Sequence, residues 1–213
     1  MLEELDFEEL DGVKLIVRED NVLAAQKKRS KGFEPISRRL WAELAGKGGT
    51  VVDAGAYSGF YSILAARSGA DRVHAFEASP LIVPRLLANL ALNDIGTVRV
   101  HPHALSRVSG QRIAIRGKDG LSSAGSIVGD GAVIGSASTL ALDDVGLAEL
   151  SVIKIDVERA EYDLLQGGAA TIRRFRPHIL IELLDEIDAV DGLLRGWGYT
   201  GEKTDSSMYH YHV

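Results

Sequence analysis

The chain has 213 residues, of which 46% are hydrophobic and none is cysteine, and its formal net charge is −6. This composition predicts one soluble, cytoplasmic domain with some decoration, and it excludes disulfides, thiolate metal ligands and a thiol nucleophile. The acidic balance and few aromatic residues argue against a nucleic-acid partner. No apolar run has the length of a membrane span, and no signal peptide is visible, so no membrane partner is expected.

Residues 1–45 are predicted to form an N-terminal extension and a helix that leads into a domain over residues 46–213. The extension starts with an acidic stretch, and residues 13–17 are a candidate short strand. A basic run over residues 27–31 is interpreted as a solvated helix face and loop, with a lid or docking patch as the alternative. Apolar residues at helical spacing predict a helix over residues 37–45.

The stretch TVVDAGAYSGFYS, residues 50–62, has the order strand, glycine turn, helix that opens a doubly wound α/β fold. Gly55 and Gly59 are expected to let the backbone approach a ligand closely. A dinucleotide site needs G-x-G-x-x-G, but Asp53 takes the first glycine position here. A carboxylate repels a pyrophosphate and tolerates the ammonium and sulfonium of S-adenosylmethionine. An ordinary βα turn is the alternative.

The second predicted strand, residues 73–77, ends at Glu77, roughly 20 residues after the glycine turn, where an acid binds ribose hydroxyls. A merely solvated glutamate is the alternative. A third strand over residues 98–101 leads to a loop at residues 104–106, expected beside the adenine. The predicted cofactor-binding residues are Asp53, Gly55, Ala56, Tyr57, Gly59, Tyr61, Glu77, Ala78, Ala104 and Leu105.

The second half continues the alternation of strands and helices. Strands are predicted over residues 150–156, 178–184 and 208–213, the last at an edge, and helices over residues 81–92, from residue 161, and over residues 187–194. The Gly/Ser/Ala-rich residues 117–138 are predicted to be a mobile lid or substrate loop, with a weak hairpin or a disordered insertion as alternatives. The fold class is α/β, with a doubly wound, mostly parallel sheet and an antiparallel edge strand.

Acids end four of the predicted strands, at the sheet edge where α/β proteins bind ligands. Asp156, Glu158 and Glu182 are therefore the candidate catalytic residues. One of them serves as general base for an acceptor hydroxyl, or Asp156 and Glu182 hold a magnesium ion. Lys154 inside an apolar strand needs a partner, and a structural pair with Glu182 is the alternative.

These motifs resemble those of the FkbM-type S-adenosylmethionine-dependent methyltransferases: VVDAGAYSGFYS, VHAFEASP, HALS, STLALDD, VIKIDVERAEYDLLQGG and RPHILIEL. The resemblance implies a Rossmann-like class I methyltransferase fold and O-methylation of a small-molecule hydroxyl on a sugar, polyketide or related natural product. The chain departs from the family pattern at Tyr57, where Asn is usual, and at Arg159, where Gly is usual. Arg159 is expected to add bulk and charge near the acceptor.

Two other functions stay open at this point. An NAD-dependent oxidoreductase would share the topology, although Asp53 and the glycine spacing disfavour it. A non-catalytic cofactor-binding protein is the third alternative, disfavoured by the cluster of acids at the sheet edge.

Overall fold

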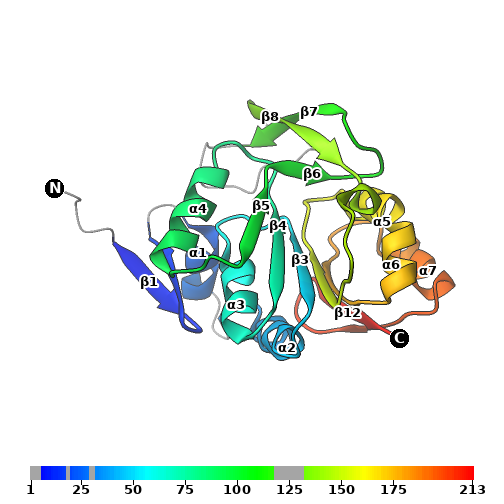
Figure 1. Cartoon of the computed structure of the whole chain (residues 1–213), viewed down its shortest axis with the longest axis horizontal. Coiled ribbons are helices and arrows are strands. Elements are labelled where there is room, and N and C mark those ends of the chain that lie inside the picture. The colour runs from blue at the N-terminus through cyan, green and yellow to red at the C-terminus, as the bar shows by residue number, and fades with distance from the viewer. Residues whose placement is uncertain (1–5, 18–19, 29–31, 118–131) are drawn as a thin grey trace.

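A computed structural model describes residues 6–17, 20–28, 32–117 and 132–213. Its centre is a seven-stranded sheet (Figure 1). In spatial order the strands are β11 (Thr200–Lys203), β12 (Met208–His212), β10 (His178–Glu182), β9 (Val152–Ile155), β3 (Thr50–Ala54), β4 (Arg72–Phe76) and β5 (Val98–His101). The five strands from β10 to β5 are parallel, and β12 is antiparallel to both of its neighbours.

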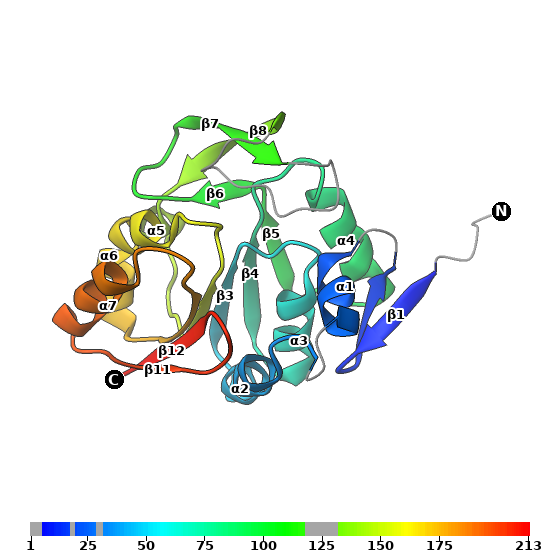
Figure 2. The same ribbon diagram turned by 180° about the vertical axis from the view of Figure 1, so that it is seen from behind.

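Helices cover both faces of this sheet (Figures 1 and 2). One layer contains α1 (Asn21–Lys28), α2 (Pro35–Ala45), α3 (Phe60–Ser68) and α4 (Val83–Leu92), and the other contains α5 (Glu161–Gly167), α6 (Ala169–Phe175) and α7 (Ile187–Gly196). Successive residues of a strand point to opposite faces, so Val51 joins the first core and Val52 the second. Every residue of β3 is buried, as expected for a central parallel strand.

A three-stranded sheet lies over the carboxyl ends of the large sheet (Figure 2). Its strands are β6 (His103–Leu105), β8 (Ala132–Leu140) and β7 (Arg112–Gly117), and the short 3₁₀ helix η1 (Leu142–Val145) follows β8. The loop predicted at residues 104–106 is therefore mostly strand. Residues 117 and 132–138 of the predicted loop belong to β7 and β8, which pair with each other, so this part is strand rather than loop. Residues 118–131, which hold the rest of the predicted lid or hairpin, lie outside the described residues.

The N-terminal residues form a hairpin of β1 (Phe7–Leu10) and β2 (Val13–Ile16). Strand β1 was not predicted, because its acidic composition gives little hydrophobic signal. Its Leu10 is nevertheless buried in the core shared with α3. Helix α4 fixes the hairpin through its amides, because Asn93 Oδ1 and Asn89 Oδ1 accept the backbone N–H groups of Lys14 and Ile16 at 2.9 and 3.0 Å. The extension thus packs onto the same core as the sheet, and its boundary at residue 46 stays a prediction.

The strand predicted over residues 208–213 is present as β12, but it is not the edge. Strand β11 lies outside it. The sequence TGEK of β11 carries no buried residue, so it gave no hydrophobic signal. None of the helices in the described segments combines the length and apolar character that a membrane-spanning segment needs.

Candidate active site

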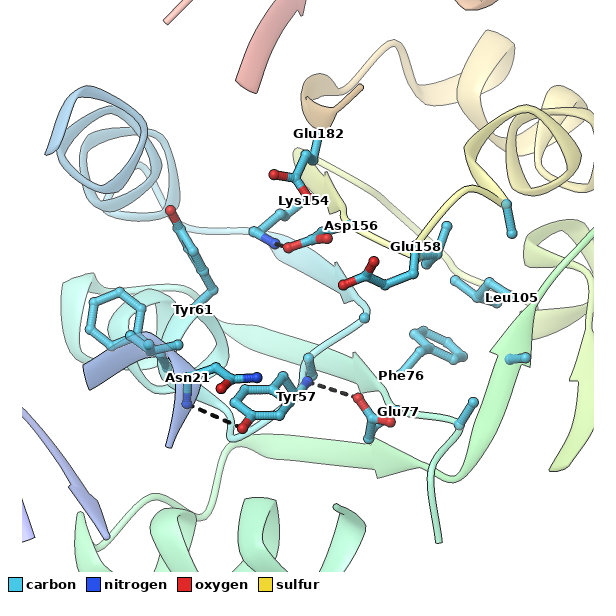
Figure 3. A pocket seen from close by; sticks show the side chains of 18 of the residues that line it. Asn21, Tyr57, Tyr61, Phe76, Glu77, Leu105, Lys154, Asp156, Glu158 and Glu182 are labelled. Atoms are coloured by element: carbon cyan, nitrogen blue, oxygen red, sulfur yellow. Dashed lines mark hydrogen bonds and ion pairs between the residues drawn. The ribbon is translucent and has the colours of Figure 1, made fainter. Parts of the chain in front are cut away.

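A cavity of about 230 Å³ opens at the carboxyl ends of β3, β4, β9 and β10, with β6 beside it (Figure 3). All three candidate catalytic acids line it: Asp156, Glu158 and Glu182. Eight predicted cofactor residues also line it, namely Gly55, Ala56, Tyr57, Tyr61, Glu77, Ala78, Ala104 and Leu105. Asp53 and Gly59 are absent from the lining, and their direct contact with the cofactor stays a prediction.

Packing within the protein requires glycine at two positions of the turn. Gly55 has a φ of 82° and Gly59 a φ of 88°, both in the left-handed region. A Cβ on Gly55 would meet the backbone oxygen of Asp156, and one on Gly59 would lie 2.7 Å from Leu86 Cδ1. Glycine at these positions lets the turn sit directly against the end of β9 and against α4.

Asp53 lies behind the turn and is fully buried. One carboxylate oxygen accepts a hydrogen bond of 2.6 Å from Ser62 Oγ on α3. Burial raises the pKa of Asp53, and the positive charge of Lys154 opposes that rise. Asp53 therefore supports the turn and the charge balance under the cavity.

Glu77 is held at the cavity wall by backbone N–H groups on both of its carboxylate oxygens. Tyr57 donates to Oε2 at 2.9 Å (Figure 3). Ser79 donates to Oε1 at 2.7 Å. The side chain is fixed with acceptor capacity left on each oxygen, which suits a cis-diol. Burial raises the pKa of Glu77 to about 7.

Lys154 is almost fully buried, and its partner is Asp156 rather than Glu182, the partner considered from the sequence. Its Nζ lies 2.8 Å from Asp156 Oδ2 and 4.7 Å from the centre of the Tyr61 ring. The strand register explains the pairing, because Lys154 stands opposite Leu180 on β10. Glu182 lies two residues further along β10, beside Asp156 rather than beside the lysine.

Glu182 and Glu158 are both affected by the charge of Asp156. Burial and that charge raise the pKa of Glu182 to about 8, while a 2.7 Å hydrogen bond from Ser207 Oγ opposes the shift. Burial and the same charge raise the pKa of Glu158 to about 7. Near neutral pH the two glutamates therefore hold protons that exposed carboxyls would have lost.

The segment after β9 that carries Glu158 has unusual backbone geometry. Glu158 and Arg159 have φ of 54° and 77°, two consecutive non-glycine residues in the left-handed region. Glu161 Oε1 accepts the N–H groups of Val157 and Arg159, each at 3.2 Å, and holds this conformation. Such strain is typical of functional segments.

Arg159 turns away from the cavity, contrary to expectation. Its Nε pairs with Asp185 Oδ2 at 3.0 Å, more than half of its side chain is exposed, and it is not among the lining residues. Arg159 therefore adds no bulk to the cavity lining, while its positive charge still acts on Glu158 and opposes the rise of the pKa of that carboxyl.

The N-terminal extension supplies one wall of the cavity, which sequence reasoning missed. Asn21, Val22, Phe33 and Glu34 all line it. Two hydrogen bonds attach this wall to the glycine-turn region: Asn21 N–H donates to Tyr57 Oη at 3.2 Å, and Tyr61 Oη donates to Glu34 Oε2 at 2.6 Å. The aromatic residues at 57 and 61 were the only available signal, because hydroxyls of buried tyrosines need partners.

Carboxyl groups dominate the polar lining. Five acidic side chains line the cavity: Glu34, Glu77, Asp156, Glu158 and Glu182. Among the described residues, Lys154 is the only lysine or arginine in this lining. This charge balance attracts a cationic ligand and repels a pyrophosphate. A sheet of this order, with such a cavity at the carboxyl ends of its strands, has the architecture of the Rossmann-like methyltransferases.

The comparisons with known proteins identify the family. The model of the methyltransferase FkbM domain matches residues 53–200, more than half of the chain. The chain therefore belongs to the FkbM methyltransferase family. A curated relative, the ribosomal protein L11 methyltransferase of Anoxybacillus flavithermus, is 48% identical over 52 residues, which are 24% of this chain and 17% of that protein.

Three solved structures share the fold. The FkbM methyltransferase of Methylobacillus flagellatus is 18% identical with a TM-score of 0.58, covering 77% of this chain and 43% of its own. An rRNA methylase of Streptococcus thermophilus is 14% identical with a TM-score of 0.54, covering 82% and 91%. A Streptococcus mutans protein described as a methyltransferase, in complex with S-adenosylhomocysteine, is 11% identical with a TM-score of 0.54, covering 83% and 94%. The chain thus spans less than half of the solved FkbM protein and about a sixth of the curated relative.

Proposed function

We propose that this methyltransferase binds S-adenosylmethionine in the acidic cavity and methylates a hydroxyl group of a small molecule. The observation that carries the proposal is the lining of five carboxyl groups against one lysine. S-adenosylmethionine has an ammonium and a sulfonium and no phosphate, so its charges match this lining. An NAD pyrophosphate would lie among like charges, which disfavours the oxidoreductase alternative.

The lining residues fit the parts of this cofactor. Glu77 faces the cavity with both oxygens oriented by backbone N–H groups, as the ribose hydroxyls require. Phe76, Ala104 and Leu105 offer an apolar surface for the adenine. Asp156 and Glu158 follow β9, where negative charge balances the sulfonium. The bound cofactor supplies an electrophilic methyl group.

Among the three acids, Glu158 is the best candidate for the general base. Its pKa of about 7 is close to the pH at which it would work, where a base is most effective. Asp156 is engaged by Lys154, and Glu182, with a pKa of about 8, keeps its proton at neutral pH. In this proposal Glu158 accepts the proton of the acceptor hydroxyl, and the strained backbone held by Glu161 aims it.

The magnesium alternative does not fit the donor set. Lys154 already supplies the positive charge beside Asp156, at 2.8 Å. Among the described residues, the group of three potential ligands close enough to share an ion lies elsewhere, on β11 and β12. No catalytic step is therefore assigned to a metal.

The acceptor is proposed as a small molecule for two reasons. The N-terminal wall closes one side of the cavity, and the carboxyl groups that line the cavity disfavour the phosphates of a nucleic acid. The relatives named above include methyltransferases of a ribosomal protein and of rRNA, so those acceptor classes belong in the test.

Calorimetry with S-adenosylhomocysteine and NAD tests the cofactor, and we expect binding of the first alone. A methyl-transfer assay then compares hydroxylated natural products with an rRNA fragment and ribosomal protein L11, with and without a chelator. Methylation of the rRNA or protein in preference to every small molecule would overturn the acceptor proposal. Loss of activity in the chelator would overturn the metal-free mechanism, and binding without any transfer would favour the non-catalytic alternative.

A further inference from the structure

Three side chains with metal-binding atoms meet on one face of the C-terminal hairpin, away from the cavity. They are Glu202 on β11 and His210 and His212 on β12, and one ligand atom from each lies within 4.8 Å of the other two. His210 and His212 are two residues apart on one strand and so share a face. Glu202 stands directly opposite His210 in the register.

We propose that these residues form a site for a divalent transition-metal ion of the zinc type. Two imidazoles and one carboxylate suit zinc and its neighbours rather than magnesium or calcium, which prefer oxygen ligands. His210 Nδ1 lies 3.4 Å from Glu202 Oε1. Two ligands of a tetrahedral zinc, each about 2.0–2.1 Å from the metal, are separated by about 3.3 Å. These two atoms are thus already spaced as neighbouring ligands.

A fourth residue orients the ligand at the centre of the group. His178, which begins β10, has its Nδ1 3.1 Å from Nε2 of His210. The nitrogen of His210 that faces Glu202 is Nδ1, so His178 occupies the opposite nitrogen. Metal-binding histidines nearly always have such a partner on the nitrogen that does not bind the metal, because it fixes the ring and its tautomer.

Burial favours the neutral form of His210, the form in which an imidazole binds a metal. Burial lowers the pKa of His210 and of His178, and the charge of Lys47 contributes in both cases, while Glu202 acts in the opposite direction on His210. Glu202 and His212 are accessible to solvent, so an ion has a route to the site.

The location implies a structural role. His178 begins β10 and Glu182 ends it at the cavity, so the metal group and the catalytic acids are separated by about 13 Å along this strand. An ion bound to Glu202, His210 and His212 would tie the edge strand β11 to β12. Three protein ligands leave the fourth position of zinc to water.

The test uses the whole chain without a polyhistidine tag, purified in a chelator and then dialysed. Calorimetry with zinc chloride should give one saturable site per chain. Zinc at 100 times its dissociation constant should raise the melting temperature by about 5–10 °C, while magnesium at the same concentration should not. His212→Gln and Glu202→Gln change accessible side chains, so both should fold and weaken zinc binding at least tenfold.

His74→Gln is the matched control. His74 Nδ1 lies 3.0 Å from His101 Nε2, so these two residues form a histidine pair like that of His178 and His210. Among the described residues, this pair belongs to no group of three potential ligands within 4.8 Å of one another. Its zinc affinity should equal that of the unmodified chain. The proposal is overturned if the unmodified chain shows no saturable site, if magnesium gives the same stabilisation, if His212→Gln binds zinc normally, or if His74→Gln weakens binding as much as His212→Gln does.

Discussion

A Cβ atom placed on Gly55 would lie 1.8 Å from the carbonyl oxygen of Asp156. The cofactor turn and the end of the catalytic strand therefore touch through backbone alone. Gly55→Ala should displace the two and destabilise the protein. Gly110 is the matched control, since its φ of 81° equals that of Gly55 within a degree, and a Cβ there meets nothing within 4 Å.

We expect Gly110→Ala to lower the free energy of unfolding by about 1–2 kcal/mol, the cost of an L residue in the left-handed region. Gly55→Ala carries the same cost plus overpacking, and should lose at least about 2 kcal/mol more. Urea denaturation of both variants measures the difference. Equal losses would contradict the close contact.

Glu77→Ala should weaken S-adenosylhomocysteine binding by about 1.5–3 kcal/mol, the range for hydrogen bonds to a charged group. The variant also removes the acceptor of the Tyr57 and Ser79 N–H groups. Glu77→Gln keeps an acceptor oxygen and separates the two effects: it should retain more of the fold's stability than Glu77→Ala and still bind less ligand. Calorimetry showing unchanged affinity in both variants would remove Glu77 from the cofactor site.

Glu158→Gln should reduce kcat about 10²-fold while leaving S-adenosylhomocysteine affinity within a few-fold. Because the pKa of Glu158 is about 7, the basic form accumulates above that pH, and the rate of the unmodified enzyme should rise with pH through about 7. The variant should lose that rise. Glu149→Gln, at a half-exposed position paired with Arg72, serves as control and should behave like the unmodified enzyme. A Glu158 variant with full activity would assign the base elsewhere.

The stability of the ligand-free protein should fall as pH increases. Burial raises the pKa of Glu182 from 4.5 to about 8, so the folded state holds a proton that the unfolded state has lost. This contribution is complete below about pH 4.5 and disappears as the pH rises through 8. One such group changes the free energy of unfolding by up to about 1.4 kcal/mol per pH unit.

Glu182→Gln mimics the protonated side chain and should flatten the decline between pH 7.5 and 8.5, where Glu77 and Glu158, with pKa values of about 7, are mostly ionised. Urea titrations at several pH values compare the two proteins. A decline of the same slope in Glu182→Gln would show that the carboxyl of Glu182 is not the source.

Periodicity predicted most of the fold, because buried parallel strands such as β9 are continuous apolar runs and carry a strong signal. The rule that α/β proteins bind ligands at the carboxyl ends of their strands predicted that the acids after β4, β9 and β10 lie together, and all of them line one cavity. Pairing was harder to predict: Glu182 was considered as the partner of Lys154, whereas the partner is Asp156, since strand register depends on tertiary packing. Strand β11 gave no sequence signal because it is an exposed edge strand. The outward direction of Arg159 gave none either, because it depends on two consecutive residues in the left-handed region.

The wall formed by Asn21, Val22, Phe33 and Glu34 belongs to residues that precede the family match, which starts at residue 53. In the proposed function, the residues for cofactor binding and proton transfer lie in the matched segment, whereas part of the cavity wall open to the acceptor precedes it. Divergence of that leading segment can therefore change which acceptor is methylated without altering any family motif. Proteins of this family that look alike by their motifs can thus differ in substrate, and grouping them by acceptor requires the sequence of the wall.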